Sequence, residues 1–241
     1  DADGKPRHDF SGRLSFSWPR DPLQGRLNPH HPDYDPLFPL GYGLDYAAGE
    51  EGPGSLVTDV AGTATADADV ISLYVGRPLP PWAVFINGDD GAAMMVAGAY
   101  AAHASGIVTA RAADMNVQED ALQVEFSGTG TGRLMFTGPG LDLGEFGESA
   151  VLSLAVSQDE APDRPLRLFV GDRSIDLAAQ AGAFVGQGWT EVSVALACFA
   201  EEGANPGRVD VPFALESDGR TQIAFGDIRF VKAGQPSLSC D

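Results

Sequence analysis

Carboxylate pairs and one histidine pair are the residues of this chain with the clearest potential for chemistry. The acidic pairs are Asp89-Asp90, Glu119-Asp120 and Asp159-Glu160, and His30-His31 stands between two prolines. Two carboxylates that face a common substrate can act as general acid and base. The chain has 34 acidic and 15 basic residues, so we expect most carboxylates to lie in solvated loops. The histidines have no acidic or cysteine partner at metal-ligand spacing, and the sequence holds neither a phosphate-binding glycine loop nor a nucleophile elbow. We therefore expect no independent catalysis.

Aromatic side chains indicate a second kind of chemistry, the stacking of a ring on the face of a sugar. Trp82 follows Pro80-Pro81 at the start of a predicted strand and is our candidate platform for carbohydrate. Tyr74 and Tyr100 are weaker candidates. We interpret Trp189, which opens an alternating strand, as a core residue, and we expect Trp18 to pack within the first segment of the chain.

Composition limits the partners of the protein. The chain has 241 residues, of which 44% are hydrophobic and 20% charged, a balance that predicts one or two globular domains. A net charge of −19 and a pI near 4.3 argue against nucleic acid or an anionic membrane as partner and suit a neutral ligand. The sequence starts at Asp1 without an apolar leader and has no apolar run long enough to span a bilayer, so we expect neither a signal peptide nor a transmembrane helix.

Cys198 and Cys240 are the two cysteines. They could form one disulfide in an oxidising compartment. The interpretation we favour leaves them unpaired, with Cys198 buried in an apolar run and Cys240 on a frayed tail.

The elements that would position these residues are nearly all strands. Leu122, Val124 and Phe126 alternate with Gln123 and Glu125, and similar alternation recurs along the chain between glycine-rich turns. The predicted strands are residues 71–75, 82–86, 92–96, 106–112, 121–126, 132–136, 150–156, 166–170, 189–195, 211–215 and 221–231, and the two short helical pieces are 178–183 and 196–202. This pattern predicts a mainly β protein, an antiparallel β-sandwich or jelly roll.

Ahead of these strands lies a segment of different character. Residues 14–18 are predicted to form a strand that ends at Pro19, and Gly41-Tyr42-Gly43 is predicted to form a turn in which the glycines permit positive φ. Residues 47–69 are small and polar and are predicted to be a linker.

Residues 12–19 and 36–44 carry a resemblance. GRLSFSWP and PLFPLGYGL resemble the sequences that end the second, α/β-sandwich domain of family 3 glycoside hydrolases, the β-glucosidase and exo-glucanase family. The resemblance implies retaining hydrolysis of terminal β-glucosyl units by a parent protein, in which the nucleophile lies on a (β/α)8 barrel and the acid/base ahead of this motif. A barrel alone takes about 250 residues, so both catalytic carboxylates are expected outside this chain.

Residues 118–136, 188–199 and 211–231 resemble the galactose-binding-like β-sandwich that follows the catalytic domains in a bacterial exo-glucanase subgroup of that family. Such sandwiches often hold a structural calcium between an early loop and the last strand. The matching groups here would be Asp89 or Asp90 with Asp227.

These features predict four parts: residues 1–46 as the tail of the α/β-sandwich domain, 47–69 as linker, 70–232 as a galactose-binding-like β-sandwich, and 233–241 as a flexible tail. The expected function is that of a non-catalytic accessory domain that packs on the catalytic domains of a periplasmic or secreted parent protein. The alternative is an independent module that binds β-glucan. Coplanar exposed aromatics on one sheet face would favour binding, and a continuous apolar patch would favour packing.

Overall fold

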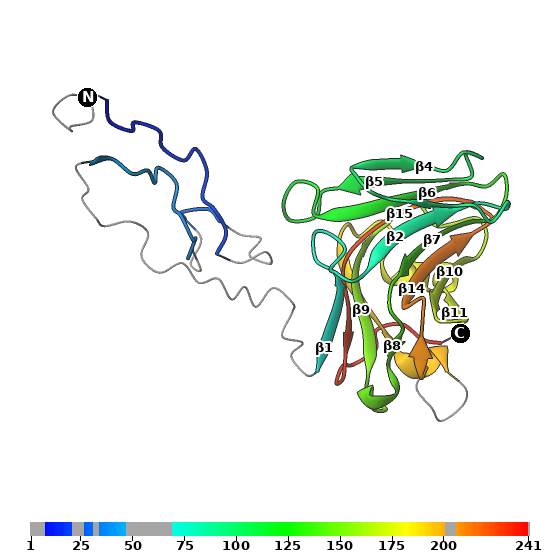
Figure 1. The fold of residues 1–241 in the computed structure, drawn as a ribbon. Helices are drawn as coiled ribbons and strands as arrows, with labels where there is room; N and C mark the ends of the chain where they lie inside the picture. The colour runs from blue at the N-terminus through cyan, green and yellow to red at the C-terminus, as the bar shows by residue number, and fades with distance from the viewer. Residues whose placement is uncertain (1–7, 21–26, 31–33, 47–68, 201–205, 241) are drawn as a thin grey trace. The chain divides into compact units, whose positions relative to one another are not determined.

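The computed structural model describes residues 8–20, 27–30, 34–46, 69–200 and 206–240, and it divides into two compact units (Figure 1). Asp1–Thr65 forms the first unit and Ala66–Asp241 the second. The predicted linker, residues 47–69, lies almost entirely outside the described residues. No helix in the described parts is long and apolar enough to cross a membrane.

The second unit is built on two antiparallel sheets. The seven-stranded sheet runs in the order β12-β9-β15-β6-β5-β4, with β1 paired to β15, and the six-stranded sheet runs β11-β10-β14-β7-β2-β3. The strands of the first are β12 (Thr190–Ala195), β9 (Val151–Ser157), β15 (Arg220–Val231), β6 (Ala121–Ser127), β5 (Val108–Ala113), β4 (Tyr100–Ala102) and β1 (Val70–Tyr74). Those of the second are β11 (Arg173–Asp176), β10 (Leu166–Val170), β14 (Phe213–Ser217), β7 (Gly132–Thr137), β2 (Ala83–Asn87) and β3 (Ala93–Met95).

The core lies between the two sheets, where alternate side chains of each strand point inward. Phe213 on β14 contacts Phe225 on β15 with ring centroids 5.5 Å apart, and Tyr74 on β1 contacts Phe136 on β7 at 6.2 Å. These aromatic contacts join the two sheets, and burial of each ring stabilises the fold by about 1.5–3 kcal/mol. The predicted antiparallel β-sandwich is confirmed.

Short elements close the ends of the sandwich. The two predicted helical pieces are 3-10 helices, η3 (Leu177–Ala183) and η4 (Leu196–Phe199). Asp176 caps η3 because its carboxylate accepts a hydrogen bond from the Ala178 amide. A third 3-10 turn, η2 (Gly144–Phe146), and a two-stranded pair of β8 (Leu141–Asp142) with β13 (Arg208–Val209) were not predicted, and neither were β4 and β11.

The first unit departs from its prediction. Residues 14–18 were expected to form a strand, but they make a single antiparallel bridge, between Trp18 and Phe38. The two rings meet edge to face at 5.8 Å, so Trp18 packs within this unit as expected. Of the two turn glycines, Gly41 has positive φ (80°), and Gly43 is required for a different reason, since a Cβ there would collide with the Gly12 carbonyl oxygen.

The interpretation of the cysteines was wrong. Cys198 and Cys240 form a disulfide across a sequence separation of 42. The predicted flexible tail is also held along its length, because Ser237 and Leu238 donate their amides to the Ser193 carbonyl and Leu238 is buried. The prediction treated the last residues as unsupported, whereas they pair alongside β12 and bring Cys240 to η4.

Loss of this disulfide is expected to destabilise the second unit. Closing a loop of this length stabilises a fold by about 2–4 kcal/mol, mainly by restricting the unfolded chain. Denaturant unfolding should therefore show a lower midpoint for Cys198→Ala/Cys240→Ala and for the reduced wild type. The double variant serves as its own control, since added reductant should not change it. An unchanged midpoint in fully reduced wild type would contradict the expectation.

Candidate functional site

Trp82, the predicted carbohydrate platform, lies just before β2 and is half-buried against the core. Gly138 lies against its ring, so close that a Cβ at this glycine would come within 2.6 Å of Cε3. Backbone therefore covers part of the indole. The ring lies at one end of the six-stranded sheet, outside the cross-strand rows described below, so its role in binding stays a prediction.

Asp89 and Asp90, two of the predicted calcium ligands, lie in the turn between β2 and β3. Asp89 accepts a hydrogen bond from the Thr131 amide at 2.7 Å, and Asp90 accepts one from the Ala92 amide at 3.0 Å. Asp90 also lies 3.5 Å from Nε2 of the buried His103. Both carboxylates therefore have the hydrogen bonds expected of turn residues.

Asp227, the third predicted ligand, lies in a bulge of β15 with φ 47°. It follows Phe225, which pairs with Leu122 at the start of β6, whereas Asp89 binds Thr131 beyond the end of β6. The structure thus does not bring Asp227 together with Asp89 and Asp90. Within the described ranges no group of three or more His, Cys, Asp or Glu side chains could hold a metal ion. The residues present do not fit the predicted calcium site.

A tightly bonded loop, residues 114–120, connects β5 to β6. The Asp120 carboxylate accepts hydrogen bonds from the amides of Met115, Asn116 and Val117 at 2.6–3.0 Å. Burial opposes its ionisation, but these amides outweigh burial and lower the pKa of Asp120. Burial, with the negative charge of Asp120 as a further cause, raises the pKa of Tyr74 to about 12, so Tyr74 is a neutral phenol at ordinary pH.

Asp120→Ala is expected to loosen this loop and to cost about 1–2 kcal/mol, because three amides lose a charged acceptor. The pKa of Asp120 is lower in the folded than in the unfolded state. Its contribution is therefore complete above the ordinary aspartate pKa and is lost as the pH falls through the lowered value. The unfolding temperatures of the wild type and of Asp120→Ala should therefore converge as the solution becomes acidic. Glu145→Gln, an exposed acid on η2, is the matched control, and a parallel pH dependence of the two variants would contradict this assignment.

The outer face of the six-stranded sheet carries a continuous row of apolar side chains. The pairing register places them side by side across five strands. This apolar row consists of Met95, Phe85, Met135, Ala214 and Phe169. Phe85, Met135 and Phe169 are partly buried, the small Ala214 is fully buried between its neighbours, and Met95 at the edge is 53% exposed.

A charged row lies beside the apolar row, one pleat further along the strands. It consists of three charged residues and one asparagine that pair side by side across the sheet: Asn87, Arg133, Glu216 and Arg167. Arg133 forms an ion pair with Glu216 at 3.5 Å and lies over the Phe169 ring at 4.5 Å from the centroid. Nε of Arg133 and Oδ1 of Asn87 are buried and have no hydrogen-bond partner.

The outer face of the seven-stranded sheet is different. Here the register aligns a transverse row of one outward residue from each of five strands: Tyr100 on β4, Arg111 on β5, Gln123 on β6, Ala224 on β15 and Ser157 on β9. Trp189 precedes β12 and completes the row, because Thr190 pairs with Val156 and places Trp189 level with Ser157.

The interpretation of Trp189 as a core residue was wrong. Val192 and Val194 point into the core, so Trp189, an odd number of positions away, points outward with Glu191. Its ring is half-buried on that face, and Nε1 donates a hydrogen bond to the Asp114 carbonyl at 3.1 Å. Counting positions back from the two valines could have revealed this orientation in the sequence.

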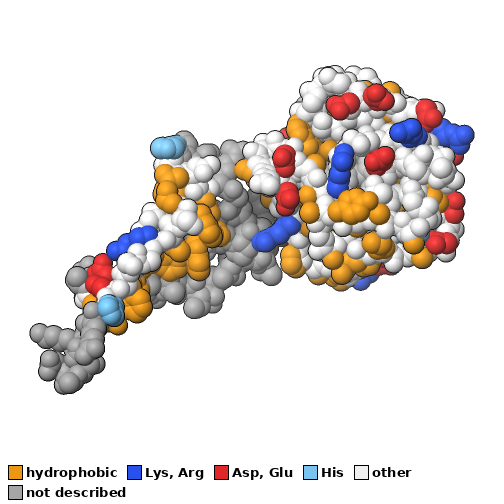
Figure 2. All heavy atoms as spheres, turned by 90° about the horizontal axis from the view of Figure 1, so that it is seen from above, with side chains coloured by type: hydrophobic (Ala, Val, Ile, Leu, Met, Phe, Trp, Pro, Cys, Tyr) orange, Lys and Arg blue, Asp and Glu red, His pale blue; other side chains and the backbone are white. Residues whose placement is uncertain are grey.

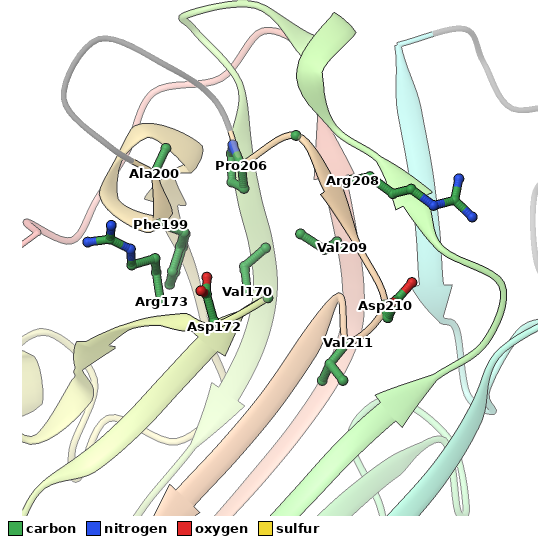
Figure 3. Close-up of a pocket in the computed structure, with 12 residues that line it drawn as sticks. Val170, Asp172, Arg173, Phe199, Ala200, Pro206, Arg208, Val209, Asp210 and Val211 are labelled. Atoms are coloured by element: carbon green, nitrogen blue, oxygen red, sulfur yellow. The ribbon is translucent and has the colours of Figure 1, made fainter.

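Shallow hollows are also present at the surface. One of about 620 Å³ lies between the β10–β11 turn, η4 and β13, and Figure 3 shows Val170, Phe199 and Val209 around it, with Arg208 pointing away. Ala200 and Pro206, which flank the undescribed residues 201–205 in the sequence, line this hollow, and we assign it no function. A more polar hollow of about 550 Å³ lies beside the transverse row and includes Glu125, Gln222 and Arg220.

Charge is spread over the surface. On the face of the second unit seen in Figure 2, acidic and basic side chains alternate with uncharged ones, and hydrophobic side chains form small separate groups. The negative charge of the chain is therefore not gathered there into one acidic patch.

Comparison with protein families identifies the second unit. Residues 80–230 match the Exop_C family of galactose-binding-domain-like domains. The chain belongs to this family. No curated protein sequence matches the Exop_C chain.

Solved structures agree with this fold. The chain is similar to the exo-1,3/1,4-β-glucanase of a Pseudoalteromonas species, with 22% identity and a TM-score of 0.60 over 99% of this chain and 29% of the glucanase. The separately solved extra C-terminal domain of that glucanase is 15% identical, with a TM-score of 0.59 over 70% of this chain and 96% of the domain. A family 30 carbohydrate-binding module is 11% identical, with a TM-score of 0.50 over 72% of this chain and 92% of the module. The chain thus spans less than a third of the length of the glucanase.

Proposed function

We propose that this Exop_C chain is a non-catalytic accessory part of a family 3 exo-acting β-glucan hydrolase, and that its sandwich packs on the catalytic domains of the same polypeptide. The apolar row on the six-stranded sheet carries this proposal. It is continuous across five strands, and sheet faces of that composition are normally covered by protein. The similarity to a glucanase more than three times as long supports the presence of further domains in the parent protein.

The chemistry of the apolar row suits a protein partner better than a sugar. Met95 and Met135 are flexible side chains that adapt to a partner surface, and methionine, phenylalanine and arginine are enriched at the centres of protein interfaces. Phe169 already has the Arg133 guanidinium over its ring, and a stacked sugar would have to displace it.

Two further features support parentage in family 3. Residues 12–19 and 36–44, which resemble the end of its second domain, pair with each other through Trp18 and Phe38 in the first unit. The Cys198–Cys240 disulfide suits an oxidising compartment, as expected for a periplasmic or secreted parent.

The purified chain is expected to show no hydrolysis of aryl β-glucosides, because the proposal places both catalytic carboxylates on other domains. A sensitive fluorogenic assay with the longer parent protein as positive control tests this. Turnover by the chain that a single carboxylate substitution within it abolishes would contradict the proposal.

Docking through the apolar row predicts that Met135→Glu destabilises the parent protein. The substitution places an unpaired carboxylate at the centre of the covered face, where desolvation is costly. The temperature at which the parent loses half of its β-glucosidase activity should fall by several degrees. Gln222→Glu, the same acid on an exposed position of the other sheet, is the control: it stands opposite Glu125, so its small cost should be the same in the parent as in the isolated chain.

The same two substitutions in the isolated chain provide a second control. Met135 is partly buried, so the isolated chain measures the cost of the substitution itself. Docking predicts that Met135→Glu lowers the temperature of the parent by several degrees more than that of the isolated chain, and that Gln222→Glu has the same effect in both. Equal inactivation temperatures of the two parent variants would exclude the six-stranded sheet as the docking face.

Carbohydrate binding is a second candidate function. The observation that favours it is the transverse row, in which Tyr100 and Trp189 stand at the two ends of one sheet face with polar side chains between them.

A further inference from the structure

We propose that the transverse row is the binding face for an extended, uncharged oligosaccharide whose chain lies across the strands of the seven-stranded sheet. This inference deepens the second candidate function and does not depend on docking through the apolar row. The ligand class follows from three properties of the row: its length, the type of group at each position, and its balance of charge.

The length of the row favours a chain of several sugar units. The backbones of Tyr100 and Trp189 belong to the first and last strand positions of a six-strand path, and the Trp189 indole reaches back across the sheet to the Asp114 carbonyl, one residue beyond β5. Ala224 and Ser157 are small, so the indole can lie across this part of the row. A ligand that contacts both aromatic side chains must still cross the strands that carry Arg111 and Gln123, about 10 Å of sheet, which is more than one sugar ring.

The two aromatic groups are available for stacking in different ways. Tyr100 is 66% exposed on the edge strand β4, and among the described residues its side chain makes no hydrogen bond or ring-to-ring contact. Trp189 is half-buried and held by its hydrogen bond to the Asp114 carbonyl. Asp114 begins the loop that Asp120 anchors through three amides, so the indole is fixed before a ligand arrives. A fixed ring loses little conformational entropy on binding.

The polar groups of the row are also held in place before a ligand binds. Arg111 Nε donates a hydrogen bond to Gln123 Oε1 at 2.7 Å, which fixes both planar groups. This bond uses one of the five N–H groups of the guanidinium and leaves the amide nitrogen of Gln123 as a donor. Hydroxyl groups of a sugar can accept from these donors, as in other sites where a few fixed polar groups orient a ligand.

Charge distinguishes among oligosaccharides. Arg111 is the one cation of the row, and the polar hollow beside the row is lined by the carboxylates of Glu125, Asp159 and Glu160 together with Arg220. The surroundings of the row therefore carry no excess of positive charge, and the whole chain carries −19. An anionic polysaccharide would therefore be repelled at long range, whereas a neutral one would not.

Isothermal titration of the purified 241-residue chain with cellohexaose and laminarihexaose tests the proposal. At least one hexaose should bind, and it should bind at least tenfold more tightly than glucose, whose single ring is too short to reach both aromatic side chains. Tyr100→Ala should weaken binding of that hexaose about tenfold, equivalent to about 1.4 kcal/mol. Trp189→Ala should weaken it at least as much, and Trp189→Phe, which keeps a ring without the indole N–H, should have an intermediate effect.

Trp82→Ala is the matched control, because this tryptophan lies outside the row, and it should leave the affinity unchanged. Tyr100→Ala is the decisive variant, since an exposed edge residue can be truncated without loosening the loop that Trp189 holds; unfolding temperatures identify any variant that has lost its fold. Absence of binding at millimolar hexaose, equal affinity for glucose, or a loss caused by Trp82→Ala but not by Tyr100→Ala would each overturn the proposal. Met135→Glu should bind like wild type, so a failed docking prediction and a failed binding prediction remain distinguishable.

Discussion

The pairing of β15 with three other strands is the constraint on which the rest of the sandwich depends. Its twelve residues pair with β6 along the first half, with β9 on the other side, and with β1 along the second half. Thr221, Ile223 and Phe225 point inward in the first half, and Ile228 and Phe230 in the second. Strict alternation would have turned the second set outward. The bulge at Gly226 and Asp227 adds one residue, and this extra residue turns Ile228 and Phe230 back toward the core. One bulge therefore keeps a continuous core under the whole strand.

The strands were largely predictable from the sequence because alternation is a local property. Leu122, Val124 and Phe126 reveal their strand without reference to any other part of the chain. The 3-10 pieces near residues 178 and 196 were visible for the same reason. Predictions failed where a partner decided the outcome: residues 14–18 make one bridge instead of a strand, and the chain end pairs alongside β12 and closes a disulfide.

The binding faces could not be predicted in the same way, because each row runs perpendicular to the chain. The transverse row joins residues from position 100 to position 224, and only the pairing register, which no local pattern contains, makes them neighbours. Local signals led instead to Trp82, which follows two prolines. The family resemblance led to Asp89 or Asp90 with Asp227, which the register separates by the length of β6. Trp189 is the exception, because it lies two positions before Glu191 and its outward orientation could be predicted from the sequence.

The two candidate faces belong to opposite layers of one sandwich, and this arrangement has a functional consequence. The core requires the inward residues of both sheets, so each sheet has its outer face free for another use. The outer face of the six-stranded sheet is apolar with paired charges beside it, and that of the seven-stranded sheet is polar with aromatic side chains at its ends. Covering the apolar row by a catalytic domain would leave the transverse row open to solvent. Docking and sugar binding are therefore compatible in one molecule, and the tests on Met135 and Tyr100 address them separately.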